Sequence, residues 1–531
     1  MPGSGKPYFD RDDTLERIEQ IAEKQKVVVY AGSGVSIDKT NLTWSGLVDK
    51  LMASRVQNHV VHEVIKPASP LEAASIVKQM YEDEFGANNA NGEIIGDLRR
   101  ILYPGQLWRQ AEFPQAVMKL IAELNDSGVD YHVLTTNYDD FLEKQQRLLD
   151  ADREDRGRDR LPLSTTTIDY DVDLTDRDAF DAQVRRFARC DHDAAAGPRG
   201  HRLVHLHGYV PQDPTVTVGS VTLSEVDYAE SYRLSAAVLE ALLREHSLLI
   251  VGSSLTDPPL LNALARTRNE AADNRLLRLA VMPMQAFELP AEDSDTVAAA
   301  VQKNIGDRMA HFRVKVTFPD FYAQATQFMT ETRIAVAEHR AGRRYKGSAV
   351  QHGRRLRSWW ETWSETRSEN WGAANQRCHE RLRDHLKNLQ ERFELTNEPM
   401  KLELWIRWEP QTNHRQFKLW AASTGTWWNK DSMRVSDIVS PLNGLPPALA
   451  TFCRGRPEIK EPPGDRWRTH LCVPVCTGER DGQELPVAVI SLASMDSATR
   501  IRQNQAASVS DITEALARIG SELVSADPFG S

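Results

Sequence analysis

The stretch Lys26–Ser36, KVVVYAGSGVS, decides how the first half of this chain folds. Val27–Tyr30 is an unbroken β-branched and aromatic run, which is typical of a strand buried on both faces of a parallel sheet. Gly32–Gly34 follows directly, and such a turn lets an anion approach main-chain N–H groups and a helix N-terminus. Because Ile37 stands where a dinucleotide fingerprint has its third glycine, the turn alone identifies no ligand.

Three later segments also predict strands that end in polar turns: Tyr131–Thr135, Arg202–Leu206 and Ser247–Val251. Two further strands are predicted at Leu276–Val281 and Phe312–Phe318, and helical patterns alternate with all of them. This alternation predicts an α/β fold with a Rossmann-like parallel sheet and helices on both faces. Because such sheets bind ligands beyond the carboxyl ends of their strands, we expect the polar turns to form one site.

Candidate catalytic side chains stand in two of these turns. Asn137 and Asp139 follow the second strand, where residues of these types also serve as helix N-caps. His207 ends the third strand, and we expect it to point to the same side as His201 and His205. A histidine at a strand end is often a hydrogen-bonded core residue, although its titration near neutral pH suits a general base. The residues alone leave both roles open.

Taken together, the four motifs resemble the SIR2 family, in particular the bacterial SIR2-like NAD hydrolases of anti-phage defence. The resemblance covers about residues 10–330 and is carried by GSGVS at 32–36, TTNYD at 135–139, LHG at 206–208 and GSSLTD at 252–257. It implies that the glycine turn holds the pyrophosphate of NAD and that Asn137, Asp139 and His207 surround the nicotinamide ribose. The NAD-binding residues that it implies are Gly32, Ser33, Gly34, Ser36, Thr136, Gly252, Ser253, Ser254 and Asp257, with Gly252 and Ser253 near the adenosine ribose.

The chain departs from the sirtuin deacylases in ways that bear on the reaction. It lacks their four-cysteine zinc module, Leu42–Trp44 replaces their Asp-Phe-Arg stretch, and Ser33 replaces their usual alanine. Without the zinc lobe, hydrolysis of NAD⁺ to nicotinamide and ADP-ribose is favoured over deacylation. The alternatives are an NAD-dependent protein deacylase or ADP-ribosyltransferase, and a non-catalytic nucleotide sensor.

The implied reaction suits the candidate side chains. Loss of nicotinamide leaves a cation-like ribose, as in glycoside hydrolysis, and Asp139 could stabilise that charge. Asn137 could orient the ribose or the attacking water, because its amide both donates and accepts hydrogen bonds. His207 could act as the base toward a ribose hydroxyl or the water.

Bulk composition bounds the class of protein. With 531 residues the chain is too long for one core, and its contents of 41% hydrophobic and 26% charged residues are those of a soluble globular protein. The five cysteines form no pair of CxxC motifs, so we expect no metal. The net charge of −10 disfavours nucleic-acid binding by the whole surface. The N-terminus has no apolar signal core and no run approaches membrane-spanning length, so we expect a cytoplasmic protein without a membrane partner.

The composition changes after about residue 335. Ten of the twelve tryptophans lie at or beyond Trp359, which supports a separate domain. We therefore expect a catalytic domain at 10–330, a basic linker and the start of a connecting helix at 331–370, and a second domain at 371–525. The basic segment 339–357 with tryptophans close behind could bind nucleic acid, but charge runs are usually solvated, so we do not expect that partner.

The second domain resembles a GAF sensor domain. The alternating segment Lys401–Trp408 predicts an antiparallel strand, and the likeness is carried by RTHLCVPV at 468–475 and LPVAVISL at 485–492. The resemblance implies a smaller α+β domain with an antiparallel sheet that binds a small ligand or dimerises. We expect a homo-oligomer in which this domain restrains the first one until a small-molecule or phage-derived activator releases it, as an effector of anti-phage (abortive infection) defence.

Four local expectations complete the pattern. The charged segment 148–200 predicts an exposed insertion, and Thr215–Val218 predicts a short strand. Glu361–Phe393 predicts one long helix. Trp427 and Trp428 are candidates for the wall of a ligand pocket.

Overall fold

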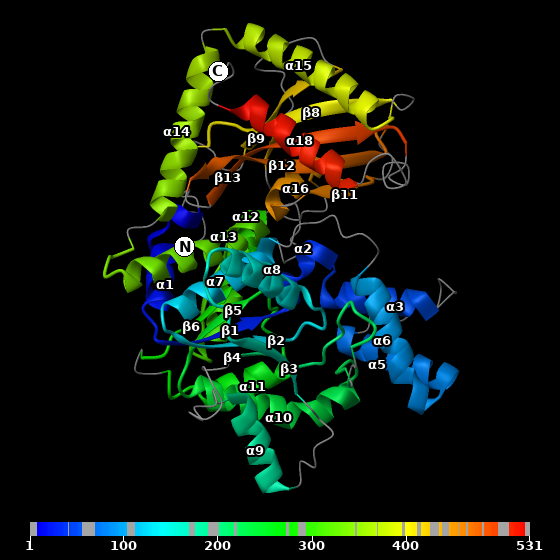
Figure 1. Ribbon diagram of the computed structural model, residues 1–531, viewed down its shortest axis with the longest axis vertical. Helices are drawn as coiled ribbons and strands as arrows, with labels where there is room; N and C mark the ends of the chain where they lie inside the picture. Colours follow the sequence, from blue (N-terminus) through cyan, green and yellow to red (C-terminus); the bar gives the residue numbers. More distant parts are fainter. Residues whose placement is uncertain are drawn as a thin grey trace.

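The chain forms two units, each built around one sheet, as a computed structural model shows (Figure 1). The structure describes residues 8–40, 42–55, 69–103, 112–168, 176–188, 201–216, 219, 221–271, 275–284, 294–345, 348–368, 370–395, 399–410, 416–424, 435–437, 445–455, 457–462, 466–480, 483–496 and 509–525.

The first sheet has seven strands in the order β3-β4-β2-β1-β5-β6-β7, and all neighbours are parallel. Its centre is β1 (Lys26–Ala31), where Val28 and Val29 are fully buried, as expected for a strand covered on both faces. The remaining strands are β2 (Asp130–Thr135), β3 (Leu163–Thr167), β4 (His201–His205), β5 (Ser247–Val251), β6 (Arg278–Val281) and β7 (Lys315–Thr317).

Helices cover both faces of this sheet. The side chains of β1 alternate, so that Val27 and Val29 join one core and Val28 and Tyr30 join the other. The first core is covered by α1 (Asp12–Ala22), α7 (Glu112–Asp126), α8 (Phe141–Asp155) and α13 (Tyr322–Arg340). The second is covered by α9 (Arg177–Ala188), α10 (Glu225–Leu243), α11 (Pro258–Arg266) and α12 (Ser294–Ala310).

A group of helices stands beside the sheet, at the right of the lower unit in Figure 1. Its core includes Tyr138 and Phe141, which follow β2 in the chain, so the helices border the carboxyl end of that strand. The group consists of α3 (Trp44–Arg55), α5 (Pro70–Phe85) and α6 (Ala87–Leu102). Shorter helical turns are η1 (Tyr8–Asp10), η2 (Ser33–Val35) and α2 (Ile37–Thr40).

The second unit has six antiparallel strands in the order β10-β9-β8-β13-β12-β11. One face packs against three long helices and the other against α16. The strands are β8 (Met400–Arg407), β9 (Gln416–Ala422), β10 (Val435–Asp437), β11 (Glu458–Lys460), β12 (Thr469–Arg480) and β13 (Gln483–Ser494). The helices are α14 (Ser348–Ser368), α15 (Trp371–Arg392), α16 (Pro447–Arg454) and α18 (Val509–Val524).

The predicted fold class is confirmed, because a parallel α/β sheet precedes a smaller α+β unit with an antiparallel sheet. The likeness to a GAF domain and the predicted domain boundaries stay predictions. None of the helices in the described part of the chain combines the length and the apolar character that a membrane crossing requires.

Several local expectations need correction. The described parts of the segment 148–200, expected as an exposed insertion, carry the end of α8, the edge strand β3 and α9. The long helix expected at Glu361–Phe393 is two helices, and the Asn370 side chain starts the second by accepting a hydrogen bond from the Ala373 N–H at 2.9 Å. Thr215 and Val216 lie in a turn and a bend rather than a strand. Trp427 and Trp428 lie outside the described residues.

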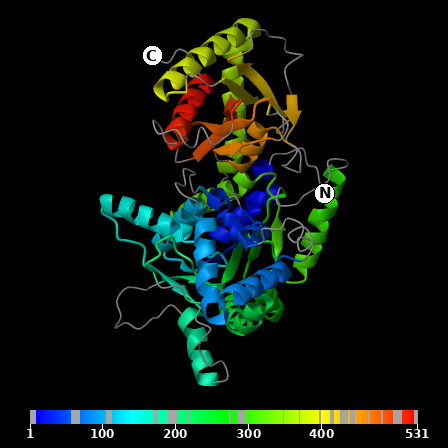
Figure 2. The same ribbon diagram turned by 90° about the vertical axis from the view of Figure 1, so that its right-hand side faces the viewer.

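The two units touch through aromatic side chains. Phe321, at the start of α13, contacts Phe452 of α16 with ring centroids 6.0 Å apart. Phe321 is buried in the same cluster as residues of β8, β9 and α16. The helix α14 runs along the second unit, and it also contacts the N-terminal η1 of the first unit (Figures 1 and 2).

Candidate functional site

All four polar turns lie at the carboxyl edge of the first sheet, after β1, β2, β4 and β5. β2 and β4 lie on one side of β1, whereas β5, β6 and β7 lie on the other. The strand order therefore reverses between β1 and β5, which is the position where open α/β sheets bind ligands. The fold and this edge together define a ligand-binding α/β domain.

Three glycines join the turns after β1 and β5. The N–H of Gly32 donates to the Val251 carbonyl at 2.9 Å, and the N–H of Gly34 donates to the Gly252 carbonyl at 2.8 Å. A Cβ at Gly32 would lie 2.6 Å from the Gly252 carbonyl oxygen, so a side chain there would force the two turns apart. Gly252 has a φ of +64°, which favours glycine. These glycines allow the two turns to approach each other closely. From the sequence alone this structural role cannot be distinguished from phosphate binding.

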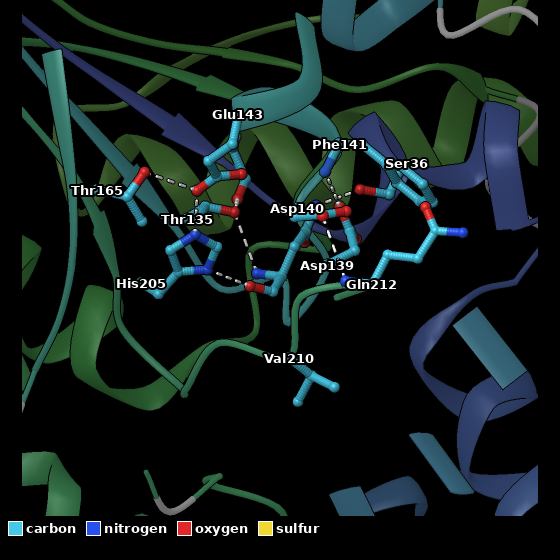
Figure 3. A network of polar contacts seen from close by, with 12 residues as sticks. Ser36, Thr135, Asp139, Asp140, Phe141, Glu143, Thr165, His205, Val210 and Gln212 are labelled. Atoms are coloured by element: carbon cyan, nitrogen blue, oxygen red, sulfur yellow. Dashed lines mark hydrogen bonds and ion pairs between the residues drawn. The ribbon is translucent and has the colours of Figure 1, made fainter. Parts of the chain in front are cut away.

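Ser36 and Asp139 lie in one polar group (Figure 3), to which Asn137 is hydrogen-bonded. Asn137 Nδ2 donates to Ser36 Oγ at 2.8 Å, and the Ser36 hydroxyl also hydrogen-bonds to the Asp139 carboxyl group. Burial raises the pKa of Asp139 to about 6, although Ser36 and the Phe141 N–H act in the opposite direction. Asn137 Oδ1 is buried and has no hydrogen-bond partner among the residues that the structure describes.

A buried ion pair between His205 and Glu143 lies next to this group and contacts the backbone of Asn137. The sequence pattern does not single out Glu143. His205 Nε2 lies 2.7 Å from Glu143 Oε1, and His205 Nδ1 lies 2.8 Å from the Asn137 carbonyl oxygen. Both ring nitrogens therefore face acceptors, which a doubly protonated ring satisfies. Burial lowers the pKa of His205, but Glu143 outweighs it and raises that pKa above its ordinary value. Thr165 of β3 donates a further hydrogen bond to Glu143 at 3.1 Å.

His207 and Asp257 form a second polar group. His207 Nε2 lies 2.8 Å from Asp257 Oδ1, and the Tyr30 hydroxyl donates to Asp257 Oδ2 at 3.0 Å. Burial would raise the pKa of Asp257, but His207 and Tyr30 keep it below its ordinary value. When the His207 ring is neutral and Nε2–H donates to Asp257, the lone pair of the ring lies on Nδ1. That Nδ1 atom is buried without a hydrogen-bond partner in the described part of the chain.

The two groups occupy different sides of the sheet edge. His205 contacts α8 on one face, whereas His207 contacts Asp257 of α11 and the Tyr228 ring of α10, at 4.9 Å, on the other. The expectation that His207 shares a side with His205 is wrong, because β4 ends at His205 and the chain then bends. The Tyr30 hydroxyl connects the groups, since it also hydrogen-bonds to Thr136, next to Asn137.

The remaining residues of the expected NAD site lie in the same turns but make local contacts. The Thr136 N–H donates to the Ala31 carbonyl at 3.2 Å. Ser253 Oγ accepts from the Leu255 N–H at 3.2 Å, and the Ser254 and Thr256 hydroxyls are 2.6 Å apart. Ser33 and Ser254 are exposed at their neighbouring turns. The structure thus brings all of the predicted residues to one edge, and divides the three catalytic candidates between two hydrogen-bonded groups.

Comparison with known proteins identifies the first unit more closely. A protein-family model described as "SIR2-like domain" matches residues 131–305, which lie in the first unit. A structure of a Sir2 enzyme aligns with a TM-score of 0.30 and 15% identity, covering 62% of this chain and 99% of that one. A structure of a SIR2 homologue in complex with NAD aligns with a TM-score of 0.28 and 13% identity, covering 61% and 94%. A search of curated proteins finds no match to this chain.

Proposed function

We propose that the first unit is an NAD⁺ hydrolase that releases nicotinamide and ADP-ribose. The observation that carries this proposal is the pair of unpartnered buried atoms, Asn137 Oδ1 and His207 Nδ1, at the ligand-binding edge of the sheet. A buried polar atom without a hydrogen bond costs about 1–3 kcal/mol, which a bound ligand with hydroxyl groups would recover. The match of residues 131–305 to the SIR2-like domain supports NAD as that ligand, because SIR2 enzymes consume it.

In this proposal each catalytic candidate has a separate task. His207 Nδ1 accepts a proton from a ribose hydroxyl or from the attacking water, while Asp257 holds the ring in place through Nε2. Asn137 Oδ1 accepts a hydrogen bond from the ribose or the water, and Ser36 fixes the amide orientation. Asp139, once ionised, stabilises the positive charge that develops when nicotinamide leaves.

Phosphate recognition in this proposal depends on side-chain hydroxyls. Gly32, Gly34 and Ser36 already use their N–H groups in hydrogen bonds within and between the turns. The exposed hydroxyls of Ser33 and Ser254, in adjacent turns, are the groups that we assign to the pyrophosphate.

The test is release of nicotinamide from NAD⁺ by the full-length protein and its Asn137→Ala variant. We expect the variant to lose about a hundredfold or more in rate, since it removes both the accepting oxygen and the Ser36 contact. Asn89→Ala is the matched control, because Asn89 is an exposed asparagine on α6 and should keep full activity. Separation of the products also detects transfer to a peptide.

Equal nicotinamide release from wild type and Asn137→Ala would reject the assignment. A mass gain of ADP-ribose on an acceptor would favour transfer over hydrolysis, and tight NAD⁺ binding without any product would favour a nucleotide sensor.

A further inference from the structure

A second polar cluster lies at the opposite edge of the first sheet. Asp130 and His132 stand at the amino end of β2, and His246 immediately precedes β5. One ligand atom from each residue lies within 4.8 Å of the others. Because β5 spans five residues at about 3.3 Å each, about 17 Å of strand separates this cluster from the candidate catalytic site.

The tautomer of His246 follows from its hydrogen bond. His246 Nδ1 lies 3.1 Å from the Leu242 carbonyl oxygen near the end of α10, so Nδ1 carries the proton and donates. In the neutral ring, Nε2 is then an acceptor. The Nε2 atom is buried without a hydrogen-bond partner among the described residues, and only 6% of the side chain is exposed.

His246 Nε2 faces a second acceptor, since Asp130 Oδ2 lies 3.4 Å away. A proton on Nε2 or a metal ion between the two atoms would each relieve the repulsion between these acceptors. A proton on Nε2 would draw the pair to about 2.7–2.9 Å, the usual length of a charge-assisted hydrogen bond. Two ligands on a tetrahedral zinc ion, each about 2.0–2.1 Å from the metal, lie about 3.3–3.4 Å apart. The separation of 3.4 Å between His246 Nε2 and Asp130 Oδ2 matches the spacing of two zinc ligands, and the ligand atoms of all three residues lie within 4.8 Å of one another.

We propose that Asp130, His132 and His246 bind one zinc ion. Two imidazole nitrogens and a carboxylate oxygen are donors that zinc prefers, and three protein ligands leave its fourth position for water. That position faces outward, because the Asp130 side chain is 32% exposed while both histidines are buried. The ion joins the starts of β2 and β5, the two strands that flank β1.

The ligands come from the strand β2 and from the residue that immediately precedes β5, rather than from closely spaced cysteines. The absence of CxxC pairs therefore gives no information about this site. The expectation that the protein binds no metal rests on cysteine spacing alone. Nothing in the site depends on the proposed NAD⁺ hydrolysis.

The test uses untagged full-length protein, purified without a metal column, stripped with a chelator and then titrated with Zn²⁺ against a chromophoric competitor. We expect tight binding of one zinc ion, and a visible absorption spectrum of tetrahedral Co²⁺ when cobalt replaces it. Asp130→Asn should weaken zinc binding at least tenfold and abolish the rise in unfolding temperature that zinc produces in wild type. Glu245→Gln is the matched control, because Glu245 adjoins His246 but pairs with Lys26 at the surface, and it should bind zinc as wild type does.

Equal zinc affinity in the wild type and in Asp130→Asn would overturn the proposal, as would the absence of any site in stripped wild type. Recovery of iron in place of zinc from the purified protein would also overturn it, since two histidines and one carboxylate can hold ferrous iron. Asp130 is partly exposed, so its variant should fold even where a substitution of the buried His246 does not.

Discussion

At the scale of single residues, Asp139 links the candidate site to pH. Burial raises its folded-state pKa to about 6, against an ordinary value of 3.8. Between about pH 4 and 6 the folded protein therefore holds a proton that the unfolded chain has lost. The free energy of unfolding should fall as pH rises through this window, by about 3 kcal/mol, and level off above it.

The variant Asp139→Asn cannot ionise and should lack this decline. Urea unfolding at several pH values between about 4 and 7 measures the free energy of unfolding of wild type and variant. The variant should become more stable relative to wild type as pH rises. Asp83→Asn, an exposed carboxylate on α5, is the control and should follow the wild-type curve. Parallel curves for wild type and Asp139→Asn would show that the buried carboxyl group does not titrate in this range.

Some residues of the candidate site can be identified from the sequence pattern, and others cannot. Asn137, Asp139 and His207 could be singled out because each stands in a polar turn directly after an apolar strand. Glu143 could not, because a glutamate in the first turn of a helix is ordinary and its partner His205 is 62 residues away. The hydrogen bond from Tyr30 to Asp257 could not be predicted either, because an aromatic residue in a buried strand is expected for packing alone.

At the scale of elements, the contact between the turns after β1 and β5 predicts that alanine at Gly252 destabilises the protein more than alanine at Gly128 does. A Cβ at Gly252 would lie 2.5 Å from the Val35 nitrogen, in a backbone conformation with φ of +64°. Gly128 has a similar φ of +71°, but nothing lies within 4 Å of its Cβ position. Gly128→Ala should therefore cost only the backbone term, about 1–2 kcal/mol, and Gly252→Ala at least about 2 kcal/mol more.

Urea denaturation of both alanine variants measures these costs. Equal losses of stability would mean that the turn after β5 moves away from β1 without penalty, and that the glycines are not needed for the contact.

Elements with a strong apolar pattern could be predicted, and those without one could not. β1 and β5 contain runs of buried Val, Leu and Ile, β2 and β4 each contain a buried pair of Val and Leu, and the order of these strands along the chain predicts a parallel sheet. β3 (LSTTT) lies at the sheet edge with two exposed residues, so its sequence resembles the polar segment around it. The break between α14 and α15 has neither Gly nor Pro in Ser368–Asn370, and only the capping contact of Asn370 marks it.

At the scale of the whole molecule, the side chain of Phe321 extends from the first unit into the core formed by α16 and the second sheet. Phe321→Ala should cost about 3 kcal/mol and separate the thermal unfolding of the two units into better resolved transitions. Phe187→Ala is the matched control, because Phe187 is a buried residue of α9 that packs into a core of the first sheet and not into the cluster of Phe321. Scanning calorimetry distinguishes the two variants, and a single unchanged transition in Phe321→Ala would show that α14 alone couples the units.

We propose that the second unit restrains the first through the same contact. Phe321→Ala should then raise nicotinamide release at 25 °C, below both unfolding transitions, whereas Phe187→Ala should not. Unchanged or lower activity in Phe321→Ala would place the control elsewhere, for example in a homo-oligomer.

The tryptophans of the second unit give the protein a built-in optical reporter. Trp359, Trp360 and Trp363 of α14 lie with Trp371, Trp408 and Trp420 in one cluster, with ring centroids 5.0–6.4 Å apart in the contacting pairs. Rings this close couple electronically, so the near-ultraviolet dichroism of the protein should be dominated by this cluster. Since α14 also borders the first unit, a signal that shifts the helix would change intrinsic emission before any product forms. Stopped-flow fluorescence could therefore time activation without a label.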